Sequence, residues 1–187
     1  MTELAFFIDY SRCIGCMACV QACEECDTHR GHSMIHLETI QRRNSVQTAP
    51  QVCMHCEDPT CARVCPADAI KQDDNGVVHS AAKPRCVACS NCVIACPFGV
   101  PKMKVEMDLM MKCDLCYDRS SRGLAPMCAS VCPTGAIFFG TYAELVADRP
   151  KAQALDVFGF GDTVIQTGCA VVVPADKEHS VVPTGYE

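Results

Sequence analysis

The chain contains no tryptophan, and its 187 residues include only four tyrosines and seven phenylalanines. The apolar fraction is 49%, but cysteine inflates it, because 18 of the apolar residues are cysteines. Without them the apolar share is about 40%, a little below that of a typical globular domain. A core built from ordinary side chains would therefore be thin. The composition predicts that bound metal fills and stabilises part of the interior.

Long apolar stretches are also missing. No uncharged apolar run approaches the roughly 20 residues that a membrane-spanning helix needs, so we expect no direct membrane span. The first nine residues include Glu3 and no basic segment, which predicts that no secretory signal peptide is present. The net charge of −6 argues against nucleic acid as a partner and favours a basic docking face on another protein.

Motifs for binding and converting an organic substrate are absent as well. The sequence has no Walker loop, no G-x-G-x-x-G motif and no recognisable Ser/His/Asp set. We therefore expect no catalytic, substrate-transforming site in this chain. Any part that it plays in an oxidoreductase complex would be to conduct electrons.

Cysteine is what the chain has in abundance. Cys86, Cys89, Cys92 and Cys96, followed by Pro97, have the C-x2-C-x2-C-x3-C-P spacing by which bacterial ferredoxins ligate iron–sulfur clusters. Three further groups of four cysteines are present: Cys13, Cys16, Cys19 and Cys23; Cys53, Cys56, Cys61 and Cys65; and Cys113, Cys116, Cys128 and Cys132. The sixteen thiols would hold four 4Fe–4S clusters. Only Cys26 and Cys169 are left over, and we expect both to be buried as small apolar groups.

Two other uses of cysteine compete with this interpretation. Disulfide scaffolds are usually short secreted domains that begin with a secretory signal. Zinc sites also use C-x2-C pairs, but those pairs are usually well separated, and a tetrahedral site rarely takes three closely spaced cysteines and a distant fourth. The spacing favours iron–sulfur clusters over both alternatives.

The spacing also predicts which cysteines share a cluster. In a C-x2-C-x2-C-x3-C run the first three thiols converge on one cluster, and the fourth points towards another. The two inner groups should therefore exchange their fourth cysteines, and so should the two outer groups. The predicted sets are quartet A (Cys13, Cys16, Cys19 and Cys132), quartet B (Cys23, Cys113, Cys116 and Cys128), quartet C (Cys53, Cys56, Cys61 and Cys96) and quartet D (Cys65, Cys86, Cys89 and Cys92).

The order of the groups predicts an α+β fold of two pseudo-symmetric two-cluster ferredoxin modules, one nested inside the other. Cys65 and Cys132 each begin the same C-P-x-x-A-I sequence, which marks an internal repeat. The expected parts are an inner module over 53–100, an outer module over 1–52 and 101–140 with an insertion at 27–52, and a C-terminal extension of helix, hairpin and docking tail over 141–187.

Short elements should connect the cysteine groups. Their signals are β-prone runs, Asn-Gly turns and a capping box. The expected elements are strands over 5–8 and 34–40 with a second arm near Val46, a hairpin turn at Asn75-Gly76, a loop over 117–127, a helix that begins with the capping box 141–144 and ends before Pro150, a hairpin over 156–173 and a polar tail from Ala175.

Other residues carry weaker signals. His29, His32 and His36 lie close together, but histidines clustered in a loop are more often solvated than metal-binding, so we expect them in solvent. Three groups begin with a basic neighbour, where a cation could raise the potential of a cluster but where we expect ordinary solvated charges: Arg12, Arg85 and Lys112. Four methionines have helical spacing and should pack as core: Met103, Met107, Met110 and Met111.

One stretch carries a family resemblance. With the four groups in this order, Lys112-Cys113-Asp-Leu-Cys116-Tyr-Asp-Arg119 and the eleven-residue gap to Cys128 resemble the four-cluster electron-transfer subunits of molybdopterin oxidoreductases. Formate dehydrogenases and the dimethyl sulfoxide, polysulfide and arsenate reductases have such subunits, and tungsten aldehyde oxidoreductases are similar. The resemblance covers roughly residues 5–140. It implies that all sixteen cysteines are ligands and that four 4Fe–4S clusters are bound.

The resemblance also implies partners. One would be a large molybdopterin or tungstopterin catalytic subunit, and the other a second redox subunit, which is either a flavin protein or a quinone-reactive membrane protein. The alternative is a free-standing soluble polyferredoxin that shuttles electrons between several enzymes. We expect a cytoplasmic protein, while export to the periplasm on a partner with a twin-arginine signal stays open.

Overall fold

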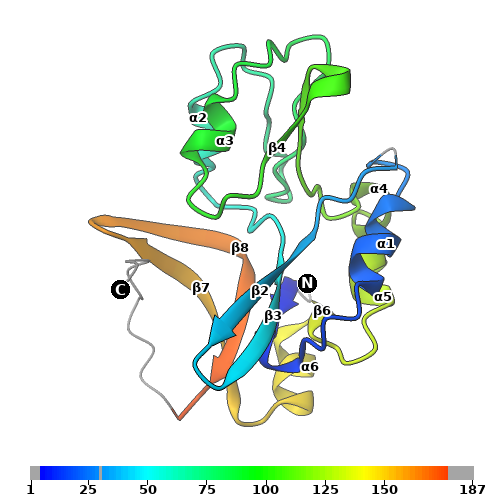
Figure 1. Ribbon diagram of the computed structural model, residues 1–187, viewed down its shortest axis with the longest axis vertical. Coiled ribbons are helices and arrows are strands. Elements are labelled where there is room, and N and C mark those ends of the chain that lie inside the picture. Colours follow the sequence, from blue (N-terminus) through cyan, green and yellow to red (C-terminus); the bar gives the residue numbers. More distant parts are fainter. Residues whose placement is uncertain (1–4, 30, 177–187) are drawn as a thin grey trace.

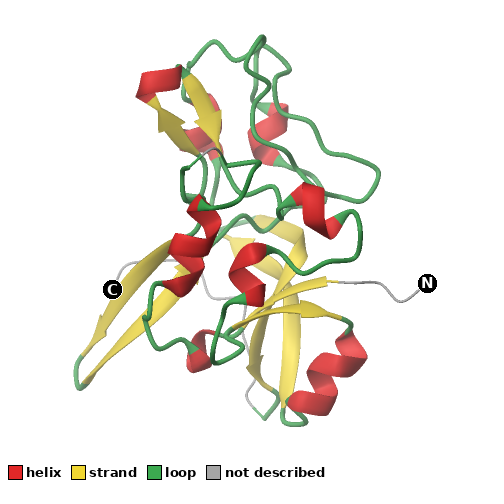
Figure 2. Cartoon of the chain, turned by 90° about the vertical axis from the view of Figure 1, so that its right-hand side faces the viewer, coloured by secondary structure: helices red, strands yellow, loops and turns green. Residues whose placement is uncertain are grey.

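The computed structural model describes residues 5–29 and 31–176, which form short helices and strands joined by long loops (Figures 1 and 2). The helices are α1 (Ala18–Glu24), α2 (Thr60–Arg63), α3 (Asn91–Ala95), α4 (Tyr117–Ser120), α5 (Met127–Ser130) and α6 (Tyr142–Asp148), with 3₁₀ turns η1 (Tyr10–Arg12) and η2 (Val105–Met107). The strands are β1 (Ala5–Ile8), β2 (His36–Arg42), β3 (Ser45–Gln51), β4 (Lys102–Lys104), β5 (Leu109–Met111), β6 (Ile137–Gly140), β7 (Ala152–Phe160) and β8 (Thr163–Pro174). This mixture of α and β elements agrees with the expected class.

A four-stranded sheet in the order β6-β1-β8-β7 forms the lower part of the molecule in Figure 1. β1 runs antiparallel to β6, with Phe6 opposite Phe139, and parallel to β8, with Phe6 opposite Cys169. Apolar and β-branched residues suit these strands, because their side chains pack well on a half-buried pleated surface. The expected strand 5–8 is confirmed, and the sheet also takes in both arms of the C-terminal hairpin.

Three predicted hairpins have different outcomes. β2 pairs with β3 from His36 to Gln51, and β7 pairs with β8 around the turn at Gly161, so both predictions are confirmed. At the predicted Asn75-Gly76 turn only a single bridge forms, between Gln72 and Val78. Those arms are too short to form a ladder.

The methionine stretch is only partly buried and forms no α-helix: Met103 and Met107 are half-buried, and Met107 ends the 3₁₀ turn η2. Met103 lies on β4 and faces Met110 on β5, so a two-stranded hairpin carries both side chains. Met110 and Met111 are fully buried, which confirms their assignment to the core. Helical spacing was misleading here, because a short antiparallel turn can bring the same residues together.

Two shorter segments complete the comparison with the sequence. The predicted capping box is present: Thr141 Oγ1 accepts a hydrogen bond from Glu144 N, and Thr141 N donates to the Glu144 carboxylate. The segment 117–127, expected to be a loop, begins instead with the single helical turn α4. The end of the predicted tail, residues 177–187, lies outside the described residues.

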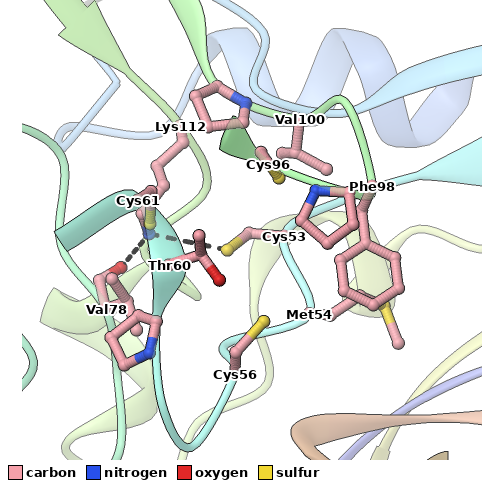
Figure 3. A pocket seen from close by; sticks show the side chains of 13 residues that line it. Cys53, Met54, Cys56, Thr60, Cys61, Val78, Cys96, Phe98, Val100 and Lys112 are labelled. Carbon is pink, nitrogen blue, oxygen red and sulfur yellow. Dashed lines mark hydrogen bonds between the residues drawn. The ribbon is translucent and has the colours of Figure 1, made fainter. Parts of the chain in front are cut away.

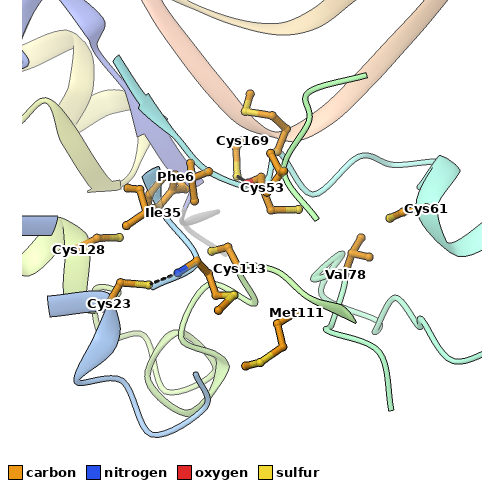
Figure 4. Close-up of a cluster of buried hydrophobic side chains, with 14 of the residues drawn as sticks. Phe6, Cys23, Ile35, Cys53, Cys61, Val78, Met111, Cys113, Cys128 and Cys169 are labelled. Atoms are coloured by element: carbon orange, nitrogen blue, oxygen red, sulfur yellow. Dashed lines mark hydrogen bonds between the residues drawn. The ribbon is translucent and has the colours of Figure 1, made fainter. Parts of the chain in front are cut away.

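The main core contains sulfur as well as hydrocarbon. Phe6 and Ile8 from β1 pack with Ile35, Met34 and Met110. Around them lie eight buried cysteines, several of which Figure 4 shows facing this interior: Cys19, Cys23, Cys53, Cys61, Cys92, Cys113, Cys128 and Cys169. The cysteine loops are thus built into the core rather than attached to its surface.

Among the described helices, the longest, α1 and α6, have seven residues each, far fewer than the roughly 20 that cross a bilayer.

Candidate metal centres

The thiols of quartet C lie around one small cavity. Cys53, Cys56, Cys61 and Cys96 all line it, and Figure 3 shows their side chains around a common space. Cys61 comes from α2 and Cys96 directly follows α3, and these two helices contact each other. The packing of α2 against α3 therefore brings the distant fourth cysteine to the first three.

Quartets A and D have the same construction. Cys13, Cys16, Cys19 and Cys132 line a second cavity, where the contact between α1 and α5 brings the distant cysteine close. A third cavity is lined by the members of quartet D: Cys65, Cys86, Cys89 and Cys92. In each case the structure brings together the four cysteines that the spacing predicts. That each set ligates a cluster stays a prediction.

Quartet B is the most deeply buried set. Cys23, Cys113, Cys116 and Cys128 are each no more than 5% exposed. Burial raises the pKa of the Cys113 thiol well above its usual value, and the negative charges of Cys128, Cys53 and Cys23 raise it further. Because these three charges act on the Cys113 thiol, Cys113 lies near two members of its own quartet and near Cys53 of quartet C.

The loops that carry the thiols have a strained backbone. Six of their residues other than glycine have a positive φ between 46° and 63°: Met17, His55, Ala88, Ser90, Leu115 and Cys116. Such residues are uncommon outside functional sites, where the surrounding structure holds them in place. Left-handed residues curl each C-x2-C segment tightly, so that neighbouring side chains point to the same side.

The thiols are costly to ionise without a positively charged partner. Burial raises the pKa of Cys56 to about 12, and the charges of Cys53, Cys96 and Cys61 contribute to the rise. Burial likewise raises the pKa of Cys19 to about 11, with contributions from Cys13 and other members of quartet A. A cationic metal core would reverse this penalty by holding all four sulfurs as thiolates. The donor sets therefore fit an iron–sulfur cluster.

His29 contradicts the expectation of a solvated histidine. It is 1% exposed, with Nδ1 3.1 Å from Cys23 Sγ and Nε2 2.9 Å from Asp114 Oδ1. Burial alone would lower its pKa, but the hydrogen bonds to Asp114 and Cys23 outweigh burial and raise the pKa to about 10. Burial would also raise the pKa of Cys23, yet the hydrogen bonds from His29 and from Met34 N lower it. His29 thus favours the thiolate of a quartet B member.

The other two histidines are more accessible. The His32 side chain is 29% exposed and its Nε2 lies 3.6 Å from Glu106 Oε1, which agrees with the expected solvated position. His36, on β2, is half-buried, and its pKa is lowered by burial and by the charges of Lys102 and Lys104. Of the three, only His29 contacts a predicted ligand in the described structure.

The basic neighbours of the cysteine groups also differ. Arg12 and Arg85 are partly exposed and pair with surface carboxylates, Asp148 and Asp68, as expected of solvated charges. Lys112 is 1% exposed, and its Nζ lies 3.5 Å from Cys53 Sγ. The expectation of a solvated charge is therefore wrong for Lys112, because the chain turns this side chain inward.

The two left-over cysteines are buried, as expected. Cys169 is fully buried on β8, where its thiol donates to the Cys53 carbonyl at 3.6 Å. Cys26 is 3% exposed and contacts the Thr28 hydroxyl at 3.2 Å. All eighteen cysteines are described, and none of them is joined to another in a disulfide. Among the described residues no group of three or more His, Cys, Asp or Glu side chains is arranged to hold a single metal ion.

Comparison with known families agrees with this geometry. The model of a 4Fe–4S dicluster domain matches residues 44–142, and the model of a 4Fe–4S binding domain matches residues 4–25. The first match alone covers more than half of the chain. The chain belongs to the 4Fe–4S dicluster family. It is an iron–sulfur protein of the ferredoxin type.

Several relatives of this family are subunits of oxidoreductases. The chain is 39% identical over 166 residues to the iron–sulfur subunit of the nitrate-inducible formate dehydrogenase of Escherichia coli, covering 77% of this chain and 56% of that protein. It is 40% identical over 153 residues to the thiosulfate reductase electron transfer subunit PhsB of Salmonella typhi, covering 78% and 79% of the two chains. The hydrogenase-2 operon protein HybA of Escherichia coli O157:H7 is 33% identical over 185 residues. The chain spans little more than half the length of the formate dehydrogenase subunit.

Proposed function

We propose that this protein is an electron-transfer subunit that relays electrons through four 4Fe–4S clusters. One end would receive or deliver electrons at a molybdenum- or tungsten-pterin catalytic subunit, and the other at a flavin subunit or a quinone-reactive membrane subunit. The observation that carries the proposal is that three of the four predicted ligand sets, quartets A, C and D, each line a cavity of their own. The relatives named as subunits of formate dehydrogenase and thiosulfate reductase support it.

The chain's residues suggest an order for the four sets. The charge of Cys19 in quartet A contributes to raising the pKa of Cys128 in quartet B, after burial and Cys23. Cys113 in quartet B is similarly affected by Cys53 in quartet C. Quartets C and D share the α2 segment, which carries Cys61 and ends beside Cys65. We infer the order A, B, C, D.

Exposure agrees with that order. Quartets A and D each include one exposed cysteine, Cys16 and Cys89, whereas all four cysteines of quartet B are buried. Apolar side chains are exposed beside both: Ile14 next to Cys16, and Val87 close to Cys89. In quartet C, Cys53 and Cys61 are buried while Cys56 and Cys96 are half-buried, so only the two end quartets have a fully exposed member, as a relay between two partners needs. The geometry thus favours docking of one partner at each end.

The nested arrangement belongs to the same proposal. Contacts between α2 and α3 would join the inner module, 53–100, and contacts between α1 and α5 would join the outer module, 1–52 with 101–140. The C-terminal part, 141–176 as far as it is described, adds β7 and β8 to the sheet of the outer module. A cytoplasmic location belongs to the proposal, because cysteines that are kept for cluster ligation need a reducing compartment while the chain is made.

The ligand pairing is tested by serine variants. Protein purified without oxygen should contain about sixteen irons per chain if four 4Fe–4S clusters are bound. Cys96→Ser should then lose the quartet C cluster and keep the quartet D cluster, and Cys65→Ser should do the reverse. Cys169→Ser is the matched control and should keep all the iron. Loss of the quartet D cluster in Cys96→Ser would refute the crossed pairing.

The role of the subunit is tested on the native complex. A complex purified through this chain should contain molybdenum or tungsten in one partner, and the second partner should either contain flavin or be a membrane protein that reacts with quinone. Rapid reduction by that partner's substrate should bleach the cluster absorbance of this chain. A stable monomer that exchanges electrons with several unrelated enzymes would support the free polyferredoxin instead.

A further inference from the structure

Lys112 is a buried cation at the junction of two predicted cluster sites. It lies between β5 and Cys113, the first ligand of quartet B in the fourth group, yet its side chain extends towards quartet C (Figure 3). Its Nζ donates to the carbonyls of Val78 and Cys113, the latter at 3.0 Å, and to Cys53 Sγ at 3.5 Å. It also lines the cavity of quartet C.

No carboxylate forms an ion pair with this lysine among the described residues. A buried ammonium that is hydrogen-bonded but has no negative partner is costly, so such charges are normally paired. The nearest candidate for a negative charge is the sulfur of Cys53, 3.5 Å from Nζ, and the Cys61 side chain lines the same cavity as Lys112. The charge that balances Lys112 is therefore the thiolate set of quartet C.

We propose that Lys112 is a positioning residue that raises the reduction potential of the cluster in quartet C, rather than that of its sequence neighbour in quartet B. This inference rests on the proposed function. One-electron reduction adds one negative charge to a cluster site, with no bond formed or broken. A fixed ammonium beside Cys53 stabilises the reduced state more than the oxidised state, and burial leaves that effect poorly screened.

The environment of Lys112 explains why this lysine and not the other basic neighbours would act. Arg12 and Arg85 are neutralised by Asp148 and Asp68 and are open to solvent, so their effect on a cluster is screened. His55, the buried histidine of the same loop, accepts a hydrogen bond from Val78 N at Nδ1, so that nitrogen carries no proton and the ring adds no positive charge beside Lys112.

The test is a redox titration of the holoprotein followed by electron paramagnetic resonance. The signal of quartet C is assigned as the one that Cys96→Ser removes. In Lys112→Met we expect at least a tenfold fall in the ratio of reduced to oxidised quartet C cluster at a fixed potential, which corresponds to about 59 mV for one electron. The other three signals should move much less. Lys112→Arg, which keeps the charge, should stay close to the wild type.

Lys102→Met is the matched control, because Lys102 is an exposed lysine on β4 whose strand partner, Met111, directly precedes Lys112. It should leave the ratio of reduced to oxidised quartet C cluster within about twofold of the wild type, since an exposed charge is screened.

An unchanged ratio in an iron-replete Lys112→Met, or a shift confined to quartet B, would overturn the proposal. Loss of the cluster in both Lys112→Met and Lys112→Arg would also overturn it, because arginine retains the charge. Fewer than four clusters in the wild type would instead refute the proposed function.

Discussion

Nδ1 of His29 lies 3.1 Å from Sγ of Cys23, while Nε2 of the same ring contacts Asp114. The imidazole therefore links two segments of quartet B, one from each end of the outer module. His29→Phe keeps a ring but removes both hydrogen bonds and leaves the Asp114 carboxylate poorly paired. We expect the free energy of unfolding to fall by about 2–4 kcal/mol. In a urea titration followed by the absorbance of the clusters, the midpoint should move to a lower urea concentration.

His32→Phe is the control for that variant, because His32 is accessible and its contact with Glu106 is long, at 3.6 Å. Its stability should stay within about 0.5 kcal/mol of the wild type. Equal losses in the two variants would mean that the contacts of His29 with quartet B contribute nothing specific.

The same histidine predicts a dependence of stability on pH. Its pKa is raised from 6.5 to about 10 on folding, since the hydrogen bonds to Asp114 and Cys23 outweigh the effect of burial. A raised pKa means that the contribution of His29 is fully present below pH 6.5 and is lost as the pH rises through about 10. The urea midpoint of the wild type should therefore fall more steeply between pH 7 and 10 than that of His29→Phe. Parallel curves would contradict this prediction.

A third prediction concerns a buried ion pair between the residue after β1 and the residue after α6. Arg149 Nε lies 3.1 Å from Asp9 Oδ2, both side chains are almost fully buried, and Arg149 also donates to the Gly135 carbonyl. Arg149→Met leaves the buried carboxylate with its hydrogen bonds from Ser11 and a longer contact with Arg12, at 3.6 Å, so we expect a loss of about 3 kcal/mol. The exposed pair Arg63–Asp58 has a shorter distance, 2.7 Å, yet Arg63→Met should cost less than about 1 kcal/mol. Chemical unfolding of both variants checks the difference, and a larger loss in Arg63→Met would reverse the argument.

The cysteine spacing predicted far more of this molecule than its hydrophobic pattern did. The side chains of residues two or three positions apart in a tight loop can adopt few relative orientations. The local spacing therefore constrains which thiols converge on one site. The predicted members of quartets A, C and D each line one cavity. Strand partners are not constrained in that way. Nothing in the alternation of β8 indicates that it pairs in parallel with β1, or that Gly168 N donates to the His55 carbonyl in the quartet C loop.

The inward turns of His29 and Lys112 could not be predicted for a related reason. His29 stands in a polar segment that contains Gly31, and Lys112 is a charged residue directly before a cysteine loop, so a solvated side chain is the ordinary outcome for both. Their burial depends on contacts with distant segments: Asp114 for the histidine, and Val78 and Cys53 for the lysine. The one available signal was that Lys112 directly precedes a ligand, and that signal indicated the wrong quartet.

The last prediction concerns Gly15, in the loop of quartet A. This glycine has a φ of +71°, and an added Cβ would lie 3.0 Å from Thr48 Cγ2. The same threonine donates its hydroxyl hydrogen to Cys13 Sγ at 3.2 Å, so displacing it disturbs a predicted ligand. Gly15→Ala should therefore cost about 2–4 kcal/mol, from backbone strain and from crowding together. Iron should also be released to a chelator faster from quartet A than from the other sets.

Gly161→Ala separates those two causes. Gly161 also has a positive φ, +58°, but lies in the turn between β7 and β8 with nothing within 4 Å of an added Cβ. It should lose only about 1 kcal/mol, through backbone strain, and keep the iron release rate of the wild type. If Gly15→Ala were no more damaging than Gly161→Ala, the contact between Thr48 and the Cys13 loop would have no part in holding quartet A. The comparison thus tests whether an insertion strand, β3, supports a metal site formed by the outer cysteine groups.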